Sequence, residues 1–230
     1  MYCNFMDDTR QGVLARVTSY GYALSVAPKY LRNDKDIVRA AVKSCGISLQ
    51  FASKSLQANK DIVLRAVKSD GCALQYASRT LRGDKDVVMA AVQRFGCALK
   101  SASFTMRKNE FIVQAAVKED ANAFQYASSV LKEDSSFCAK LIKQNHDNDR
   151  LVYILVKRYG CLLRFASDTI KDKKNVVHEA VRSDGCALRF ASERLKKDSN
   201  LLPIALKSCC TKGCYCVMMP LILNYQSIPS

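Results

Sequence analysis

The side chains that could do chemistry in this chain are its cysteines, its two histidines and its many basic residues. The sequence has 11 Cys, 2 His and 36 Lys plus Arg against 21 Asp plus Glu, a formal net charge of +15. Catalysis by a nucleophile and a base needs both groups and an orienting partner. His146 lies in a polar stretch, and His178 stands where sibling repeats carry unrelated residues. The sequence therefore predicts no enzyme and no cofactor.

Four cysteines crowd together near the C-terminus, at Cys209, Cys210, Cys214 and Cys216. Four thiolates could hold zinc, but structural zinc sites use paired ligands on separated knuckles, so this cluster is only a weak metal candidate. Acylation beside the apolar run VMMPLIL is a second option. We favour a third interpretation, an irregular tail that is prone to oxidation, and we predict no metal site.

The other repeated cysteines, Cys72, Cys97, Cys161 and Cys186, each follow a glycine. We expect them to be buried packing thiols. The N-terminus lacks the basic and apolar regions of a secretory signal, and no apolar run approaches the roughly 20 residues of a membrane span. These features predict an intracellular, cytoplasmic protein in a reducing compartment, without a transmembrane segment.

The basic residues are organised in two columns that repeat along the chain, and they are our candidates for anion binding. The first column contains Lys43, Lys68, Lys118, Lys143, Lys157, Arg182 and Lys207. The second contains Arg32, Arg82, Arg107, Lys132, Lys171 and Lys196. Stacking of repeats would turn each column into a stripe that attracts polyanions. The alternative is a solvated surface whose cations complement helix dipoles.

The elements that position these residues follow a period of 25. The dipeptide Ala-Ser recurs at residues 52–53, 77–78, 102–103, 127–128, 166–167 and 191–192. Glycines at the predicted structural turn keep the same spacing, at Gly21, Gly46, Gly71, Gly96, Gly160 and Gly185. A fixed period of this length indicates a repeat protein.

Residues 61–85 illustrate one unit. Ile62, Val63, Ala66 and Val67 share one face of a first helix, which we call helix A, and Gly71 follows it where a left-handed residue would end a helix. After the glycine, the spacing of apolar residues predicts a second α-helix, helix B, of about ten residues. Helices this short are unstable alone, so each hairpin must bury its apolar face on the next. The sequence predicts an all-α fold, an α-solenoid of 25-residue helix-turn-helix repeats.

The period fails once, because Ala127 and Ala166 are 39 residues apart instead of 50. The missing 11 residues correspond to one helix B near residues 144–150, so two helices of the A type follow one another and we expect a bend or break. We predict a first sub-array over residues 1–145, in which residues 8–31 form a degenerate capping repeat. A second sub-array would span residues 146–208, and an irregular Cys-rich tail residues 209–230.

The strings DKDIV, AAVKS and GCALQYAS and their copies resemble the short helical repeat catalogued as domain of unknown function 4116. The resemblance covers roughly residues 21–207. It implies a helical repeat fold and no mechanism, since that family has no established activity, substrate or cofactor.

Two functions follow from these observations. The first is a non-catalytic scaffold for protein–protein interaction, with an extended or acidic protein partner. The alternative is a basic repeat protein that binds RNA or another polyanion through the two columns. A continuous positive stripe would favour the alternative, and scattered charge with an apolar groove would favour the scaffold. The chain could also be part of a larger modular protein.

Overall fold

The computed structural model describes residues 8–208, and every regular element in that range is a helix. The chain divides into two compact units, Met1–Leu131 and Lys132–Ser230. The sequence analysis places the division after residue 145, so helix α9 (Ser135–Gln144) lies in the second unit rather than in the first sub-array. The predicted tail, residues 209–230, lies outside the described residues.

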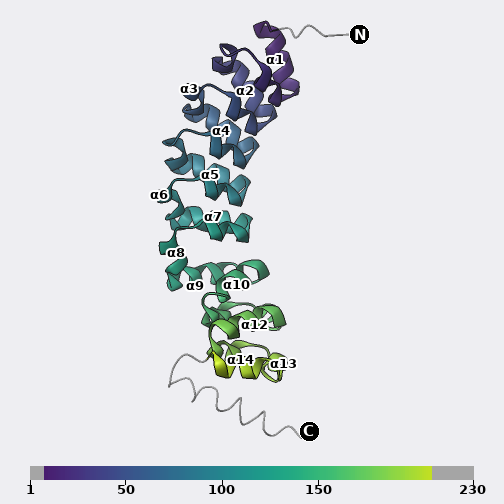
Figure 1. The fold of residues 1–230 in the computed structure, drawn as a ribbon, viewed down its shortest axis with the longest axis vertical. Helices are drawn as coiled ribbons and strands as arrows, with labels where there is room; N and C mark the ends of the chain where they lie inside the picture. Colours follow the sequence, from purple (N-terminus) through teal and green to yellow (C-terminus); the bar gives the residue numbers. More distant parts are fainter. Residues whose placement is uncertain (1–7, 209–230) are drawn as a thin grey trace, which may run out of the picture. The chain divides into compact units, whose positions relative to one another are not determined.

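One layer of the first unit is a stack of ten-residue α-helices, which correspond to helix A (Figure 1). They are α1 (Arg10–Ser19), α2 (Lys35–Ser44), α4 (Lys60–Ser69), α5 (Lys85–Arg94) and α7 (Glu110–Glu119). In α4, Ile62, Val63, Ala66 and Val67 are fully buried, as their spacing predicts. The N-cap of α4 is Asn59, whose side-chain oxygen accepts a hydrogen bond from the Ile62 N–H at 3.2 Å. The apolar face and the cap together explain why these short helices form.

The second layer consists of six-residue 3₁₀ helices, so the prediction of a ten-residue α-helix B is wrong. They are η1 (Gly21–Val26), η3 (Gly46–Phe51), η4 (Gly71–Tyr76), η6 (Gly96–Ser101) and η7 (Ala121–Tyr126). Gly71, Leu74 and Ala77 are buried at a spacing of three residues, which is the period of a 3₁₀ helix. The 3₁₀ helices pack on each other and on the α-helices of the first layer.

A dipeptide connects each 3₁₀ helix to a single helical turn; it is Ala27-Pro28 in the first repeat and Ala-Ser in the others. These turns are η2 (Leu31–Asn33), α3 (Lys54–Gln57), η5 (Leu81–Gly83) and α6 (Phe104–Arg107). Ala77 is buried, and the Ser78 N–H donates to the Gln57 carbonyl of the preceding repeat at 2.9 Å. The Ser78 hydroxyl oxygen accepts from the Leu81 N–H at 3.3 Å and caps the next turn. The dipeptide is repeated because it joins neighbouring repeats and starts the following turn.

The glycines are required by close packing and not by a left-handed conformation, which corrects the prediction for this position. No left-handed φ occurs at Gly21, Gly46, Gly71, Gly96 or Gly160. A Cβ added to Gly71 would lie 2.5 Å from the carbonyl oxygen of Ala91 in the next repeat. The equivalent distance at Gly160 is 2.1 Å, to the Ala180 oxygen. The 3₁₀ helix thus crosses the neighbouring α-helix with no room for a side chain.

Helix α8 (Ser129–Glu133) spans the boundary between the units, and the second unit has the same two layers. Its α-helices are α10 (Asp149–Val156), α12 (Lys174–Ser183) and α14 (Leu201–Lys207), its 3₁₀ helices are η8 (Gly160–Phe165) and η9 (Gly185–Phe190), and its single turns are α11 (Asp168–Lys171) and α13 (Glu193–Lys196). Helix α9 runs into α10 through residues 145–148 with no 3₁₀ helix between them, as the 11-residue deletion predicts. Helix α9 packs against η8, and it thereby occupies the position that another 3₁₀ helix has in the regular repeats.

Candidate functional site

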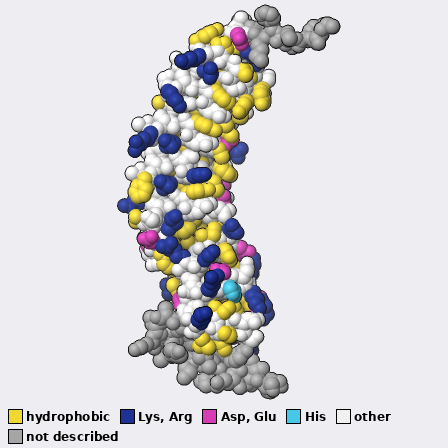
Figure 2. Space-filling view, in the orientation of Figure 1, with side chains coloured by type: hydrophobic (Ala, Val, Ile, Leu, Met, Phe, Trp, Pro, Cys, Tyr) yellow, Lys and Arg dark blue, Asp and Glu magenta, His cyan; other side chains and the backbone are white. Residues whose placement is uncertain are grey.

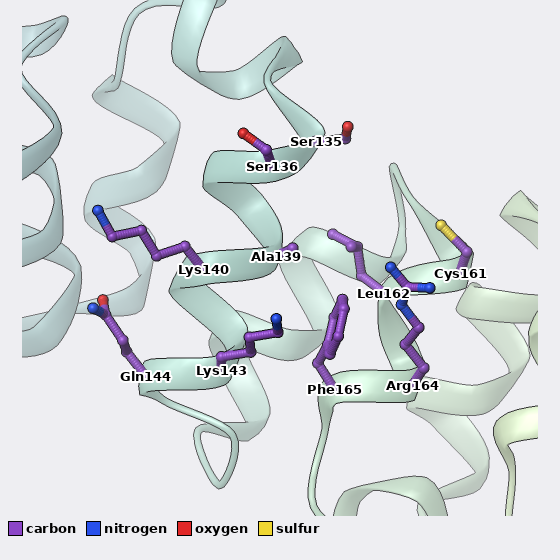
Figure 3. Close-up of a pocket in the computed structure, with 10 residues that line it drawn as sticks. All are labelled: Ser135, Ser136, Ala139, Lys140, Lys143, Gln144, Cys161, Leu162, Arg164 and Phe165. Atoms are coloured by element: carbon purple, nitrogen blue, oxygen red, sulfur yellow. The ribbon is translucent and has the colours of Figure 1, made fainter.

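A groove in the second unit lies between α9 and η8 (Figure 3). Its volume is about 670 Å³, within the range of ligand pockets. It is lined by Ser135, Ser136, Ala139, Lys140, Lys143, Gln144, Cys161, Leu162, Arg164 and Phe165. Three of these side chains are basic and none is acidic. The groove therefore combines an apolar floor with positive charge.

Phe165 is the centre of this arrangement. The Lys143 Nζ atom lies 4.5 Å from the centroid of its ring, and the Arg164 guanidinium carbon lies 4.3 Å from the same centroid. Figure 3 shows the ring between the two cationic side chains. Cations bind aromatic faces in this way through the ring quadrupole. Lys143 belongs to the first predicted column, whereas Arg164 and Phe165 were not predicted as site residues.

The groove lies where the repeat is broken. Between the first two repeats, the residue after the turn glycine contacts the aromatic residue of the following repeat: the rings of Tyr22 and Phe51 are 4.8 Å apart and edge to face. Phe165 occupies the position of Phe51, but α9 offers no 3₁₀ residue equivalent to Tyr22. Lys143 lies over the ring instead, and the space beside it stays open. The 11-residue spacing defect is the sequence signal that could have located this site.

The first predicted column is exposed throughout, from Lys43 in α2 to Lys207 in α14. Within residues 8–208, no ion pair involves Lys43, Lys68 or Lys118. On the face seen in Figure 2, Lys and Arg side chains stand in separate clusters between hydrophobic and uncharged atoms. They form no continuous band on that face.

The rest of the first column lies in the second unit. Lys157 is the exposed C-cap of α10. Arg182 and Lys207 line a second cavity of about 480 Å³ together with His178, Ile204 and Ser208. Arg182 also lies 3.9 Å from the Glu179 carboxylate. The residues of the first column in this unit therefore lie in different local environments.

The second predicted column is half-buried at all its positions, Arg32, Arg82, Arg107, Lys132, Lys171 and Lys196. The backbone carbonyl oxygens of Arg32 and Arg82 accept the Ser53 and Ser103 N–H groups of the following repeats. Lys171 and Lys196 form ion pairs with Asp168 and Glu193 of their own turns. These residues belong to the contact between repeats, so the column is not a fully exposed stripe.

Acidic residues at the starts of the α-helices connect neighbouring repeats. Lys60 lies 2.8 Å from Asp84 and 2.9 Å from Asp86. The hydrogen bond from Lys60 lowers the pKa of Asp84, whose carboxylate also accepts from the backbone N–H groups of Asp86 and Val87. Asp36, Asp61 and Asp86 all lie in first turns, where they complement the helix dipole. The acidic residues at the starts of these α-helices thus largely form ion pairs.

The repeated cysteines are less buried than we predicted. Cys72, Cys97 and Cys186 are half-buried and Cys161 is exposed, because the position after the glycine faces the edge of the 3₁₀ layer. Burial, and then the neighbouring Asp120 carboxylate 2.8 Å from the sulfur, raises the pKa of Cys97 to about 11. Such a thiol is a poor nucleophile at neutral pH.

Among residues 8–208, no group of three or more His, Cys, Asp or Glu side chains is placed to hold a metal ion. The Cys209, Cys210, Cys214 and Cys216 cluster lies outside this range. His146 is 56% exposed and next to Asp147, while its carbonyl oxygen accepts the Ser167 N–H in the hydrogen bond that joins repeats. No described helix has the length and apolar character needed to cross a bilayer.

A family described as domain of unknown function (DUF4116) matches three segments of the chain, residues 10–57, 59–107 and 148–196. Each segment contains two α-helices and two 3₁₀ helices of the layers, so the family unit is a pair of the 25-residue repeats. The residues between the second and third segments contain the repeat break. Comparison with curated proteins finds no match, and comparison with solved structures finds none.

Proposed function

Because this chain belongs to the family described as domain of unknown function (DUF4116), whose description states no activity, we propose its function from its own surfaces. We propose that it is a non-catalytic helical-repeat scaffold that binds a protein partner. The observation that carries this proposal is the groove between α9 and η8, where apolar and basic side chains meet without an acidic residue.

Several features support a binding role for the groove. The half-buried Phe165 provides apolar surface above the buried Leu162, and Lys143 and Arg164 provide hydrogen-bond donors at the rim of the groove. Core apolar contacts with a polar rim are typical of protein interfaces, and Arg and Phe are enriched in them. The groove lining has no acid–base pair. Outside the lining, the pKa values of the Cys97 and Cys138 thiols are raised to about 11, which makes both thiols poor nucleophiles.

Polyanion binding is the second candidate. The exposed Lys43, Lys68 and Lys118, which lack ion pairs within the described residues, favour it. Against it, the second column is half-buried, and the basic clusters in Figure 2 are separate. A salt series with labelled single-stranded RNA and with heparin tests this candidate. RNA affinity well above heparin affinity, lost when the three lysines are changed to Gln, would replace the scaffold proposal.

The scaffold proposal is tested by selecting random displayed peptides on the purified full chain. Ala139 lines the groove on α9, and Ala139→Trp would fill it. Met89, at the same helical position in α5 and also half-buried, gives the matched control Met89→Trp. We expect selected peptides to bind the wild type and Met89→Trp and to lose binding to Ala139→Trp. Selected peptides that bind all three proteins equally would place the interaction elsewhere.

A further inference from the structure

We propose that the groove between α9 and η8 takes an acidic, extended segment of a partner protein, with its carboxylates on Lys143 and Arg164. This inference rests on the proposed scaffold function and names the chemistry of the partner. It follows from three observations: the local charge, the occupied faces of the Phe165 ring and the dimensions of α9.

The first observation is that the lining of the groove contains three basic side chains and no acidic one. Elsewhere in the second unit, some basic residues pair with acids: Lys173 contacts Asp149, and Lys174 lies 2.7 Å from Asp198. In contrast, the interaction seen for both Lys143 and Arg164 is with the Phe165 ring. An ammonium and a guanidinium over a ring retain N–H donors that a carboxylate can accept.

The second observation distinguishes a peptide from a nucleic acid. Single-stranded nucleic acids bind aromatic side chains by stacking bases on the ring. Cations approach the Phe165 ring at 4.5 and 4.3 Å, and Figure 3 shows them on either side of it. A base could stack on Phe165 only by displacing one of the cations. A carboxylate binds the cations where they lie and leaves both contacts with the ring intact.

The third observation is the size of the groove. It extends along α9 from Ser135 to Gln144. Ten helical residues rise about 15 Å, which is the length of about four or five extended residues. A volume of about 670 Å³ accommodates a segment of that length. Ser135, Ser136 and Gln144 at the ends of the groove offer polar groups that can bond an extended backbone.

Fluorescence anisotropy with three labelled probes tests the inference: a ten-residue glutamate peptide, a ten-residue glutamine peptide and a ten-residue uridine oligonucleotide. The proteins are the full-length wild type, the double variant Lys143→Gln/Arg164→Gln, and the control Lys68→Gln/Lys118→Gln, which removes the same charge from exposed positions of the first column. We expect the glutamate peptide to bind best and to lose at least about tenfold in affinity only in the groove variant. Circular dichroism verifies that both variants are folded.

The other outcomes separate this inference from the scaffold function. Equal losses in both double variants would show a general charge effect and overturn the inference, as would no binding of the glutamate peptide to the wild type. If the glutamine peptide binds as well as the glutamate peptide and its binding is lost in the groove variant, the proposal of an acidic partner is wrong while the scaffold function stands. If the uridine oligonucleotide binds more tightly than either peptide, both are wrong.

Discussion

Gly71→Ala is the substitution for which the structure gives the sharpest expectation. The new Cβ would lie 2.5 Å from the Ala91 carbonyl oxygen and 2.9 Å from the Phe95 Cβ, whereas ordinary contact begins near 3.4 Å. The nearest atom belongs to the backbone of α5 and cannot rotate away. Neighbouring repeats must therefore separate locally, which weakens the packing of η4 on α5.

Overpacking of this kind costs about 1–3 kcal/mol of unfolding free energy. For a chain of this length, each kcal/mol changes the midpoint of thermal unfolding by about 2–4 °C. We therefore expect Gly71→Ala to lower the midpoint of thermal unfolding of the chain by between about 2 and 12 °C. Far-UV circular dichroism of the full chain during heating measures it.

Gly83→Ala is the matched control. A Cβ at Gly83 would meet the Ser103 side chain at 3.4 Å or more, and its φ is not left-handed. The substitution should stabilise the first unit by about 0.4–1 kcal/mol, because alanine has less freedom in the unfolded chain. If Gly71→Ala melts at or above the temperature of Gly83→Ala, the close-packing explanation of the turn glycines is wrong.

Three further predictions concern caps, charge and thiols. Asn59→Ala should destabilise α4 by about 1 kcal/mol while Asn59→Asp should not, and thermal melts compare the two. The pKa of Asp84 is lowered in the folded state by Lys60, so the stability from this pair is present above the ordinary pKa of 3.8 and is lost as pH falls through the folded value. Lys60→Gln should therefore show a smaller loss of urea stability between neutral and strongly acid pH, and an unchanged loss would refute this. Because the pKa of Cys97 is about 11, mass spectrometry after brief alkylation at neutral pH should find Cys97 labelled more slowly than the exposed Cys161; equal labelling would contradict it.

The first basic column was accessible from sequence, and one of its members, Lys143, lines the groove. The period predicts that Lys43, Lys68 and Lys118 share one surface, and the structure places all three at exposed positions in last helical turns. The spacing defect predicts a local irregularity but not its chemistry. Nothing in the one-dimensional pattern shows that Arg164 and Lys143 meet at Phe165, because they lie on different elements that approach only after α9 has taken the place of a 3₁₀ helix.

The sequence by itself determined the repeat length, the buried face of each α-helix and the position of the missing element, because these depend on local spacing of apolar residues. Tertiary structure decided the rest. The segment after each glycine forms a 3₁₀ helix because the Gly71 backbone lies against the Ala91 carbonyl of the next repeat, a contact that no local propensity encodes. The groove depends in the same way on contacts between α9 and η8, and so only the folded unit brings its cations together.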